Sequence, residues 1–154
     1  TGSLGDIMKE SAEIAFSYIK SCHDILGIDK TIFTDNDFHI HVPDGATPKD
    51  GPSAGITMLI AVISLLKGKG VDPKLAMTGE INLQGKVLPI GGIKEKVIAA
   101  LAAGVKKVIL PEKNKKDIEK LPDEVKKNIE FKFCGTIMDV AKIAMPPVKK
   151  SRKK

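Results

Sequence analysis

Apolar residues recur with two different spacings over the first 42 positions, and these spacings predict a helix followed by a strand. From Leu4 to Cys22 they recur every three or four residues, as on one face of a helix, and Ser3 lies in front as a candidate N-cap. Over positions 38–42 they alternate with His39 and His41. Alternate residues share one face of a strand, so the pattern places both histidines on its polar face.

The next segment predicts a loop and then a buried helix. Positions 43–52 hold three prolines and two glycines, a composition typical of a loop. Directly after it, Ser53 opens a run that reaches Leu66 and is apolar around most of the helical circumference. A helix of that kind is buried on nearly all sides, so we expect it at the centre of the protein.

The third segment predicts a hairpin and an Ala-rich helix. Two apolar runs, 75–83 and 86–90, flank a Gln-Gly turn signal and predict antiparallel strands. Two consecutive glycines then break the pattern, and a helix is predicted over 93–103, with Gly104 in the usual C-terminal position.

The last segment predicts alternating strands and helices. In order, these are a buried strand at 108–110, helical turns around 114–128, a strand near 129–133 and a helix near 137–144. Together the elements predict an α/β (α+β) fold, a single domain with a mixed sheet and helices packed against it.

Length and composition then limit the class of protein. A chain of 154 residues suits one domain, and 42% hydrophobic with 29% charged residues is typical of a globular protein. The longest apolar run covers 54–66, well short of the roughly 20 residues that a membrane helix needs, and no export signal is visible. Cys22 and Cys134 form no CxxC pair, which favours a reducing compartment.

The net charge of +6 comes almost entirely from the C-terminal end. Five of the 25 basic residues lie in the last six positions, and the remaining 20 nearly balance the 19 acids. We therefore expect a basic flexible tail over 146–154 and no nucleic-acid partner, because 4% aromatic residues provide no platform for stacking bases.

The pentapeptide GPSAG at 51–55 matches the G-x-S-x-G pattern that exposes a nucleophilic serine in α/β-hydrolases. A serine in front of a helix is also an ordinary N-cap, so the match alone leaves Ser53 with two readings. The α/β-hydrolase order requires a histidine after the serine. That family is excluded because all histidines precede Ser53: His23, His39 and His41.

A catalytic serine needs a base, and the sequence offers two kinds. A histidine triad would combine His41, Asp44 or Asp50, and Ser53, three residues within 13 positions across a proline-rich loop. The other kind is a lysine whose pKa is lowered by burial.

Two lysines at the start of the Ala-rich helix could serve as that base, or both could be ordinary solvated residues. By helical period Lys94 points into the apolar stripe that is formed by Ile93, Val97, Ile98 and Leu101. Lys96 instead lies beside Ala99, Ala100 and Ala103. Periodicity alone favours Lys94. The face of small residues favours Lys96, because another element can approach closely there.

Other chemistries lack support in the sequence. No G-x-x-x-x-G-K-[ST] motif is present to hold nucleotide phosphates. His39 and His41 could point at one metal ion, but no third His or Cys lies at metal-site spacing, so we expect a polar strand face and no metal.

Three segments together resemble the proteolytic domain of Lon, the ATP-dependent serine protease of bacteria and mitochondria. They are PKDGPSAGITM at 48–58, AMTGEINLQGKVLPIGGIKEKVIAA at 76–100 and GVKKVILPEKNKKDIE at 104–119. The likeness extends from TGSLGDIMKES to about residue 145 and implies a Lon-type domain over 1–145. Because the family has further strand-forming residues upstream of TGSLGD, it also implies a domain trimmed at its N-terminal edge.

The resemblance implies a Ser-Lys dyad. Ser53 matches the catalytic serine of the family, and Lys96, the second lysine of GGIKEK, matches its catalytic lysine. Four further residues match positions associated with shaping the site: Thr78, Glu80, His39 and Asp50.

The family further implies a serine endopeptidase that degrades unfolded, damaged or short-lived regulatory proteins inside a ring of six subunits. An ATPase module outside this sequence would bind ATP and Mg, whereas peptide cleavage itself needs no cofactor. The expected location is the cytoplasm, with the mitochondrial matrix as the alternative. The rival function is a non-proteolytic Lon-like assembly module, but such modules lack the serine and lysine pair.

Overall fold

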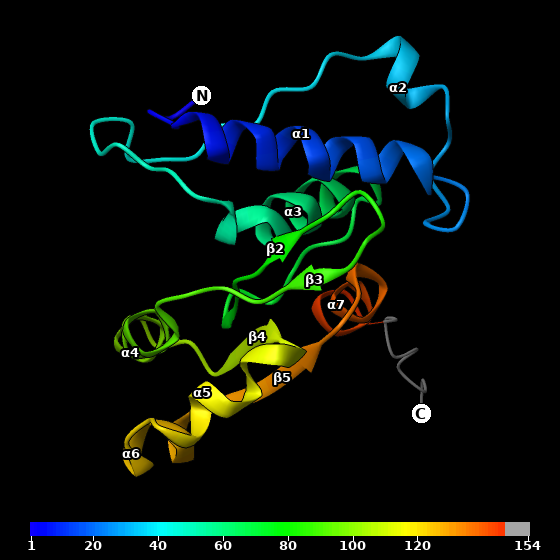
Figure 1. The fold of residues 1–154 in the computed structure, drawn as a ribbon. Helices are drawn as coiled ribbons and strands as arrows, with labels where there is room; N and C mark the ends of the chain where they lie inside the picture. Colours follow the sequence, from blue (N-terminus) through cyan, green and yellow to red (C-terminus); the bar gives the residue numbers. More distant parts are fainter. Residues whose placement is uncertain (147–154) are drawn as a thin grey trace, which may run out of the picture.

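The computed structural model describes residues 1–146, which form helices on both faces of a small sheet (Figure 1). The helices are α1 (Asp6–Ser21), α2 (Ile32–Asp35), α3 (Gly55–Leu66), α4 (Ile93–Ala102), α5 (Lys115–Glu119), α6 (Asp123–Asn128) and α7 (Ile137–Ala144), with the 3-10 turns η1 (Pro52–Ala54) and η2 (Glu112–Asn114). The strands are β1 (Leu75–Met77), β2 (Glu80–Ile81), β3 (Val87–Leu88), β4 (Lys107–Pro111) and β5 (Glu130–Cys134).

The strands form a parallel sheet and a separate antiparallel pair. The parallel sheet has the order β1-β4-β5, with Leu75 opposite Lys107 and Lys107 opposite Glu130. The antiparallel pair joins β2 to β3, with Glu80 opposite Leu88. Strands of both orientations with helices packed on them confirm the predicted α/β class.

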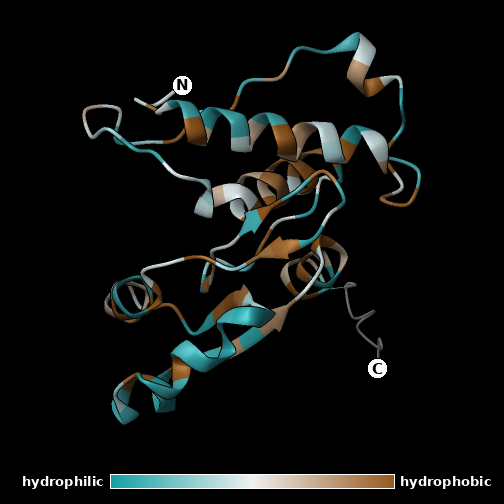
Figure 2. Ribbon diagram, viewed as in Figure 1, coloured by the Kyte–Doolittle hydropathy of each residue, from teal (hydrophilic) through white to brown (hydrophobic). Residues whose placement is uncertain are grey.

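The parallel sheet separates two hydrophobic cores because alternate side chains of β4 point to opposite faces. Ile109 belongs to the first core, between the sheet and helices α1, α3 and α7. Val108 and Leu110 belong to the second core, between the sheet and helices α4, α5 and α6. Figure 2 shows the apolar α3 inside the first layer and the mainly polar outer surface of α5 and α6.

The predicted hairpin is partly wrong, because its first strand is divided at Thr78 and Gly79. Residues 75–77 pair with β4 instead, and only Glu80–Ile81 pairs with Val87–Leu88. The amide of Gly79 donates to the Ser53 carbonyl at 2.8 Å, and its carbonyl accepts from the Ile56 amide at 3.1 Å. The backbone of Gly79 is therefore hydrogen-bonded to the start of α3 and to the turn in front of it.

The predicted strand at 38–42 is extended in the structure but forms no sheet. Within the described residues its backbone bonds reach Thr1 alone: the Thr1 amino group donates to the Ile40 carbonyl at 2.8 Å, and the Val42 amide donates to the Thr1 carbonyl at 3.0 Å. One residue is too short a partner to build a strand ladder. The expected alternation is present, because Phe38 packs against Phe16 of α1 while His39 is exposed.

The N-terminal end of α1 also differs from the prediction, since Ser3 is not its cap. Ser3 has a positive φ of 58°, and the N-cap position belongs to Gly5, which has no side chain to accept a bond from the first-turn amides. The helices predicted at 93–103 and 137–144 are confirmed as α4 and α7, and Gly104 follows α4 with φ 77°.

The C-terminal tail prediction falls outside the described residues except at Pro146. Within residues 1–146, none of the helices has both the length and the apolar character that a bilayer-spanning segment requires.

Candidate active site

Ser53 lies in the 3-10 turn η1, directly in front of α3. The turn is preceded by Gly51, whose φ of 107° is disfavoured for residues with a side chain. No side-chain capping bond is present at the start of η1 or of α3, so the Ser53 hydroxyl does not act as a helix cap. It is half-buried and directed towards α4, where it meets a lysine.

The turn between β1 and β2 fixes the backbone of Ser53. The Ser53 carbonyl accepts two hydrogen bonds, from the Gly79 amide at 2.8 Å and from the Thr78 hydroxyl at 3.0 Å. The Thr78 amide in turn donates to the Ile109 carbonyl of β4 at 3.2 Å. Ser53 is thereby anchored to the central strand of the sheet, and Thr78 acts on its backbone.

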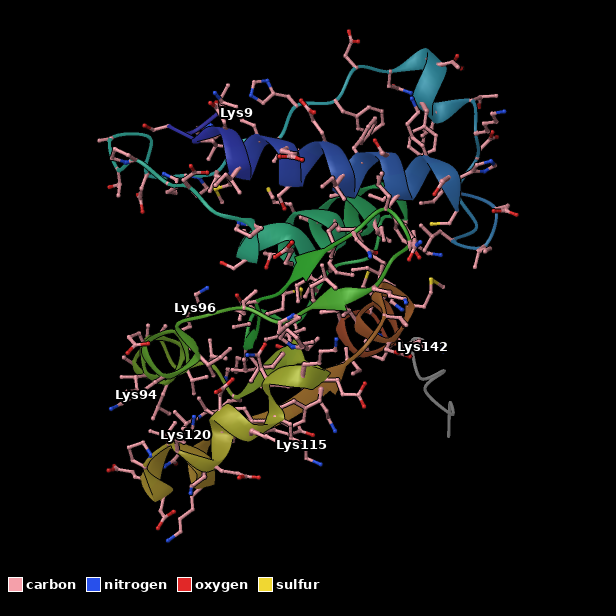
Figure 3. The ribbon with its side chains drawn as sticks, viewed as in Figure 1. Lys9, Lys94, Lys96, Lys115, Lys120 and Lys142 are labelled. Carbon is pink, nitrogen blue, oxygen red and sulfur yellow. The ribbon has the colours of Figure 1, made fainter. Side chains whose placement is uncertain are left out.

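Lys96 reaches Ser53 from the opposite layer of the protein. Its Nζ donates to Ser53 Oγ at 2.8 Å. Figure 3 shows Lys96 projecting from α4 on the side opposite to Lys94, which is exposed to solvent. Burial lowers the pKa of Lys96, because the charged ammonium loses water when it lies against the pocket wall.

A pocket of about 350 Å³ opens beside the contact between Ser53 and Lys96. Lys96 is the one ionisable side chain among the described residues that line it. The remaining lining is small, apolar or hydroxyl-bearing: Ala54, Thr57, Ala76, Met77, Thr78, Val97, Ala99, Ala100 and Val108. The alanine face of α4 noted in the sequence is thus one wall of this pocket.

Asp50 lies near the loop but serves the start of α1. Its Oδ1 accepts from the Met8 amide at 2.9 Å and from the Gly51 amide at 2.7 Å. A Cβ placed on Gly5 would lie 2.3 Å from the Asp50 carboxyl carbon, so only glycine permits this approach. Asp50 therefore caps α1 from 42 residues away.

Glu80 lies on β2, which packs against the η1 turn that holds Ser53, whereas His39 lies beside Thr1. The Glu80 carboxylate makes no hydrogen bond or ion pair with any residue of 1–146. His39 Nε2 contacts the Thr1 hydroxyl at 2.8 Å, and His41 Nδ1 contacts the same hydroxyl at 2.9 Å. The histidines therefore do share one face, as predicted, but a histidine triad with Ser53 is absent from the described part of the chain.

No set of three or more His, Cys, Asp or Glu side chains within 1–146 is arranged to hold a metal ion. The pair His39 and His41 thus gains no third ligand from the fold.

Sequence reasoning missed one buried contact of the serine loop. Ser11 of α1 is 4% exposed, and its hydroxyl donates to the Pro52 carbonyl at 3.4 Å. A Cβ on Gly55 would approach Ser11 Oγ to 2.9 Å. The available signal was a serine on the apolar face of the first helix.

The comparison with known families is decided by a match that covers nearly the whole chain. The profile of the Lon protease C-terminal proteolytic domain matches residues 1–147. This chain belongs to that family. Curated Lon proteases are similar over 94% of its length, at 58% identity in Desulfosudis oleivorans and 57% in Desulforamulus reducens. The Lon protease of Bacillus thuringiensis is 54% identical over 97% of the chain.

The matched region is a small part of those Lon proteases. The chain spans 18% of the Desulfosudis and Desulforamulus proteins and 19% of the Bacillus protein. The likeness accordingly concerns the proteolytic domain of Lon and no other part of those proteins.

Proposed function

We propose that the chain is a serine endopeptidase domain in which Ser53 is the nucleophile and Lys96 the general base. The observation that carries the proposal is the 2.8 Å contact between Lys96 Nζ and Ser53 Oγ beside an apolar pocket. A serine hydroxyl attacks a peptide only when a neighbouring base takes its proton, and a lysine can do so only when neutral. Burial of Lys96 acts in that direction.

In the first half of the reaction, Ser53 Oγ attacks the carbonyl carbon of the peptide while Lys96 Nζ takes the hydroxyl proton. The carbonyl oxygen becomes an oxyanion, which the backbone amide of Ser53 in η1 can stabilise because the first amides of a helical turn have no acceptor within it. The first amides of α3 are already used, Gly55 on the Pro52 carbonyl and Ile56 on the Gly79 carbonyl. The C–N bond then breaks, and Lys96 delivers its proton to the leaving amine. The products are a free amine and an ester on Ser53.

In the second half, water attacks the ester while Lys96 takes one of its protons. The C–O bond to Ser53 breaks, and Lys96 returns the proton to the serine oxygen. The carboxylic acid leaves and the dyad is restored. The apolar pocket next to Ser53 suits an apolar side chain of the substrate.

For the whole protein we carry over the family expectations as proposals. They are degradation of unfolded, damaged or short-lived regulatory proteins, a hexameric ring, a domain boundary near residue 145, and ATP-driven delivery by a module outside this sequence. The cytoplasm remains the proposed location, with the mitochondrial matrix as the alternative.

The test is labelling with a serine-directed peptidyl phosphonate, followed by mass spectrometry of the modified peptide. The proposal expects one adduct, on Ser53, and loss of fluorogenic-peptide cleavage in step with labelling. Ser53→Ala should remain folded and lose at least about 1000-fold in kcat/KM. A chain that neither reacts nor cleaves would instead support the non-proteolytic assembly module.

A further inference from the structure

The chain passes from the first core to the second in the short segment between β3 and α4. Val87 of β3 is buried in the first core, whereas Ile90 packs against the second. Gly91 and Gly92 complete the crossing, and Gly92 adopts a left-handed φ of 69°. A Cβ on Gly91 would meet nothing within 4 Å. Two adjacent glycines, of which Gly91 has free space around it, therefore form a joint with few steric constraints directly in front of the helix that bears Lys96.

One buried side chain fixes the residue in front of this joint. Asn114 is 4% exposed, and its Oδ1 accepts from the Ile90 amide at 3.0 Å while its Nδ2 donates to the Ile90 carbonyl at 2.9 Å. Nδ2 also donates to Asp117 Oδ2 at 2.8 Å. Asn114 thus pairs with both backbone groups of Ile90 as a neighbouring strand would.

Asn114 lies at the start of α5, where an asparagine side chain usually caps the helix. Asn114 is the N-cap residue of α5, where asparagine is strongly preferred because its oxygen can accept from the first turn. It makes no such capping bond. Its side-chain oxygen instead bonds to a residue 24 positions earlier, so Asn114 joins the crossing segment to the start of α5, where it also contacts Asp117.

The crossing segment is connected directly to the backbone of Lys96. The Gly92 carbonyl accepts from the Lys96 amide at 3.2 Å in the first turn of α4. Buried Ile93 and Val97, together with the partly buried Ala100 and Leu101, hold the helix on the second core. The direction in which the chain enters the helix depends in addition on how the segment in front of the glycine joint is held. A change in that direction would move Lys96 Nζ relative to Ser53 Oγ, since the two come from different layers.

We infer that Asn114 is a positioning residue for the dyad: by clamping Ile90 it fixes the start of α4 and so holds Lys96 within hydrogen-bond distance of Ser53. The inference rests on the proposed function, in which Lys96 is the base. Asn114 bonds to neither Ser53 nor Lys96, and it acts on the dyad through its bonds to Ile90 in the crossing segment.

The test compares Asn114→Ala with Asn128→Ala, a control in the same layer. The Asn128 side-chain amide donates to the Glu124 carbonyl at the exposed end of α6 and makes no bond to Ile90. Amide hydrogen exchange, which requires no turnover, is measured for peptides that cover Ile90 and the first turn of α4. Asn114→Ala should accelerate exchange there by about 10-fold or more while α3 keeps its protection, and Asn128→Ala should change neither.

Peptide cleavage provides the second readout, at a temperature where circular dichroism shows every variant folded. Asn114→Ala should lower kcat/KM by up to about 100-fold, and its pH–rate curve should move to higher pH because Lys96 regains water. Lys96 is the one ionisable side chain lining the pocket within 1–146, and Glu95 beside it on α4 is exposed. A purely structural role would lower the melting temperature without moving the pH–rate curve.

A rescue variant separates positioning from general stability. Gly91→Ala stiffens the joint at a position with free space, so adding it to Asn114→Ala should recover part of the lost kcat/KM. Unchanged exchange at Ile90, or a kcat/KM of Asn114→Ala within about two-fold of the parent, would overturn the inference. If the parent chain itself fails to cleave or to react with the phosphonate, the proposed function fails, and exchange at Ile90 still decides whether the clamp exists.

Discussion

Lys96 differs from the other lysines on the surface because its ammonium lies in a pocket with no acid to pair with. Within the described residues the pocket lining contains no carboxylate, and loss of water is the cause of its lowered pKa. Lys94 lies two residues earlier, about 200° away around the helix, and its side chain is exposed to solvent. Two neighbouring lysines on one helix therefore have different chemistry.

Substitution of the two lysines by methionine should separate these environments. Lys96→Met should remove peptide cleavage almost completely, by about 1000-fold or more, because Lys96 is the one ionisable side chain within 1–146 that lines the pocket beside Ser53. Lys94→Met is the matched control and should keep most of its turnover. Both are assayed with the same fluorogenic peptide after circular dichroism confirms the fold. Equal losses in the two variants would contradict the assignment.

The pH dependence should follow the neutral fraction of Lys96. Because burial lowers its pKa in the folded chain, cleavage should rise with pH, with a midpoint below the value of about 10.4 for a free lysine. Between those two values the unfolded chain binds more protons, so the contribution of Lys96 to stability rises with pH and is lost as pH falls through the lowered pKa. A pH–rate curve with a midpoint near 6.5 would indicate a histidine base instead.

Asp50 should affect stability through α1. Removing its carboxylate leaves the Met8 amide without an acceptor, so Asp50→Ala should lower the free energy of unfolding by about 0.5–2 kcal/mol. Asp50→Asn retains an oxygen acceptor and should lose clearly less. Urea denaturation at neutral pH measures both, and an equally large loss in Asn would show that the charge, and not the cap, is what matters.

At the scale of elements, the turn between β1 and β2 determines where Ser53 lies. Gly79 is buried between Val87 and Ile56, and a Cβ there would approach Val87 Cγ1 to 3.1 Å and Ile56 Cδ1 to 3.3 Å. The same glycine donates to the Ser53 carbonyl. A side chain added at Gly79 would therefore shift the turn and, through this hydrogen bond, the backbone of Ser53.

Gly79→Ala should consequently reduce both stability and turnover. We expect a loss of about 1–3 kcal/mol from overpacking, and a lower kcat at temperatures where the variant is folded. Gly45→Ala is the control, because a Cβ at Gly45 meets nothing within 4 Å. Thermal melting and steady-state kinetics give the two values, and unchanged kcat in folded Gly79→Ala would show that the turn does not position Ser53.

Elements with a strong local pattern were predictable, and those that depend on distant partners were not. The periodicity of α3, α4 and α7 gave their places nearly to the residue. The run at 75–83 looked like one strand because nothing local shows that its first part pairs with β4, some 30 residues later.

The candidate site shows the same limit. The motif predicted Ser53, and the alanine face of α4 together with the resemblance predicted Lys96, but periodicity alone pointed to Lys94. The apolar stripe that favoured Lys94 includes Ile98, which is 41% exposed in the structure. The cap made by Asp50 and the clamp made by Asn114 both join residues more than 20 positions apart. No local sequence pattern could therefore predict them.

At the scale of the whole molecule, the sequence lacks the phosphate-binding loop that ATP-driven chemistry would need. We expect the chain by itself to hydrolyse no ATP and to cleave short peptides at a rate that ATP does not change. A malachite-green phosphate assay beside the peptide assay checks both. Stoichiometric binding of nucleotide by this chain would contradict the prediction.

Because Ser53 and Lys96 come from opposite layers, heat should inactivate the chain before it melts. Ser53 is anchored to the first core through α1 and α3, and Lys96 stands on the second. Warming loosens the least stable contacts first, and a slight rotation of one layer over the other lengthens the Oγ–Nζ distance while both cores keep their packing. Activity should therefore decline several degrees below the circular-dichroism transition and return on cooling. Two curves that coincide would mean that the layers move as one rigid unit.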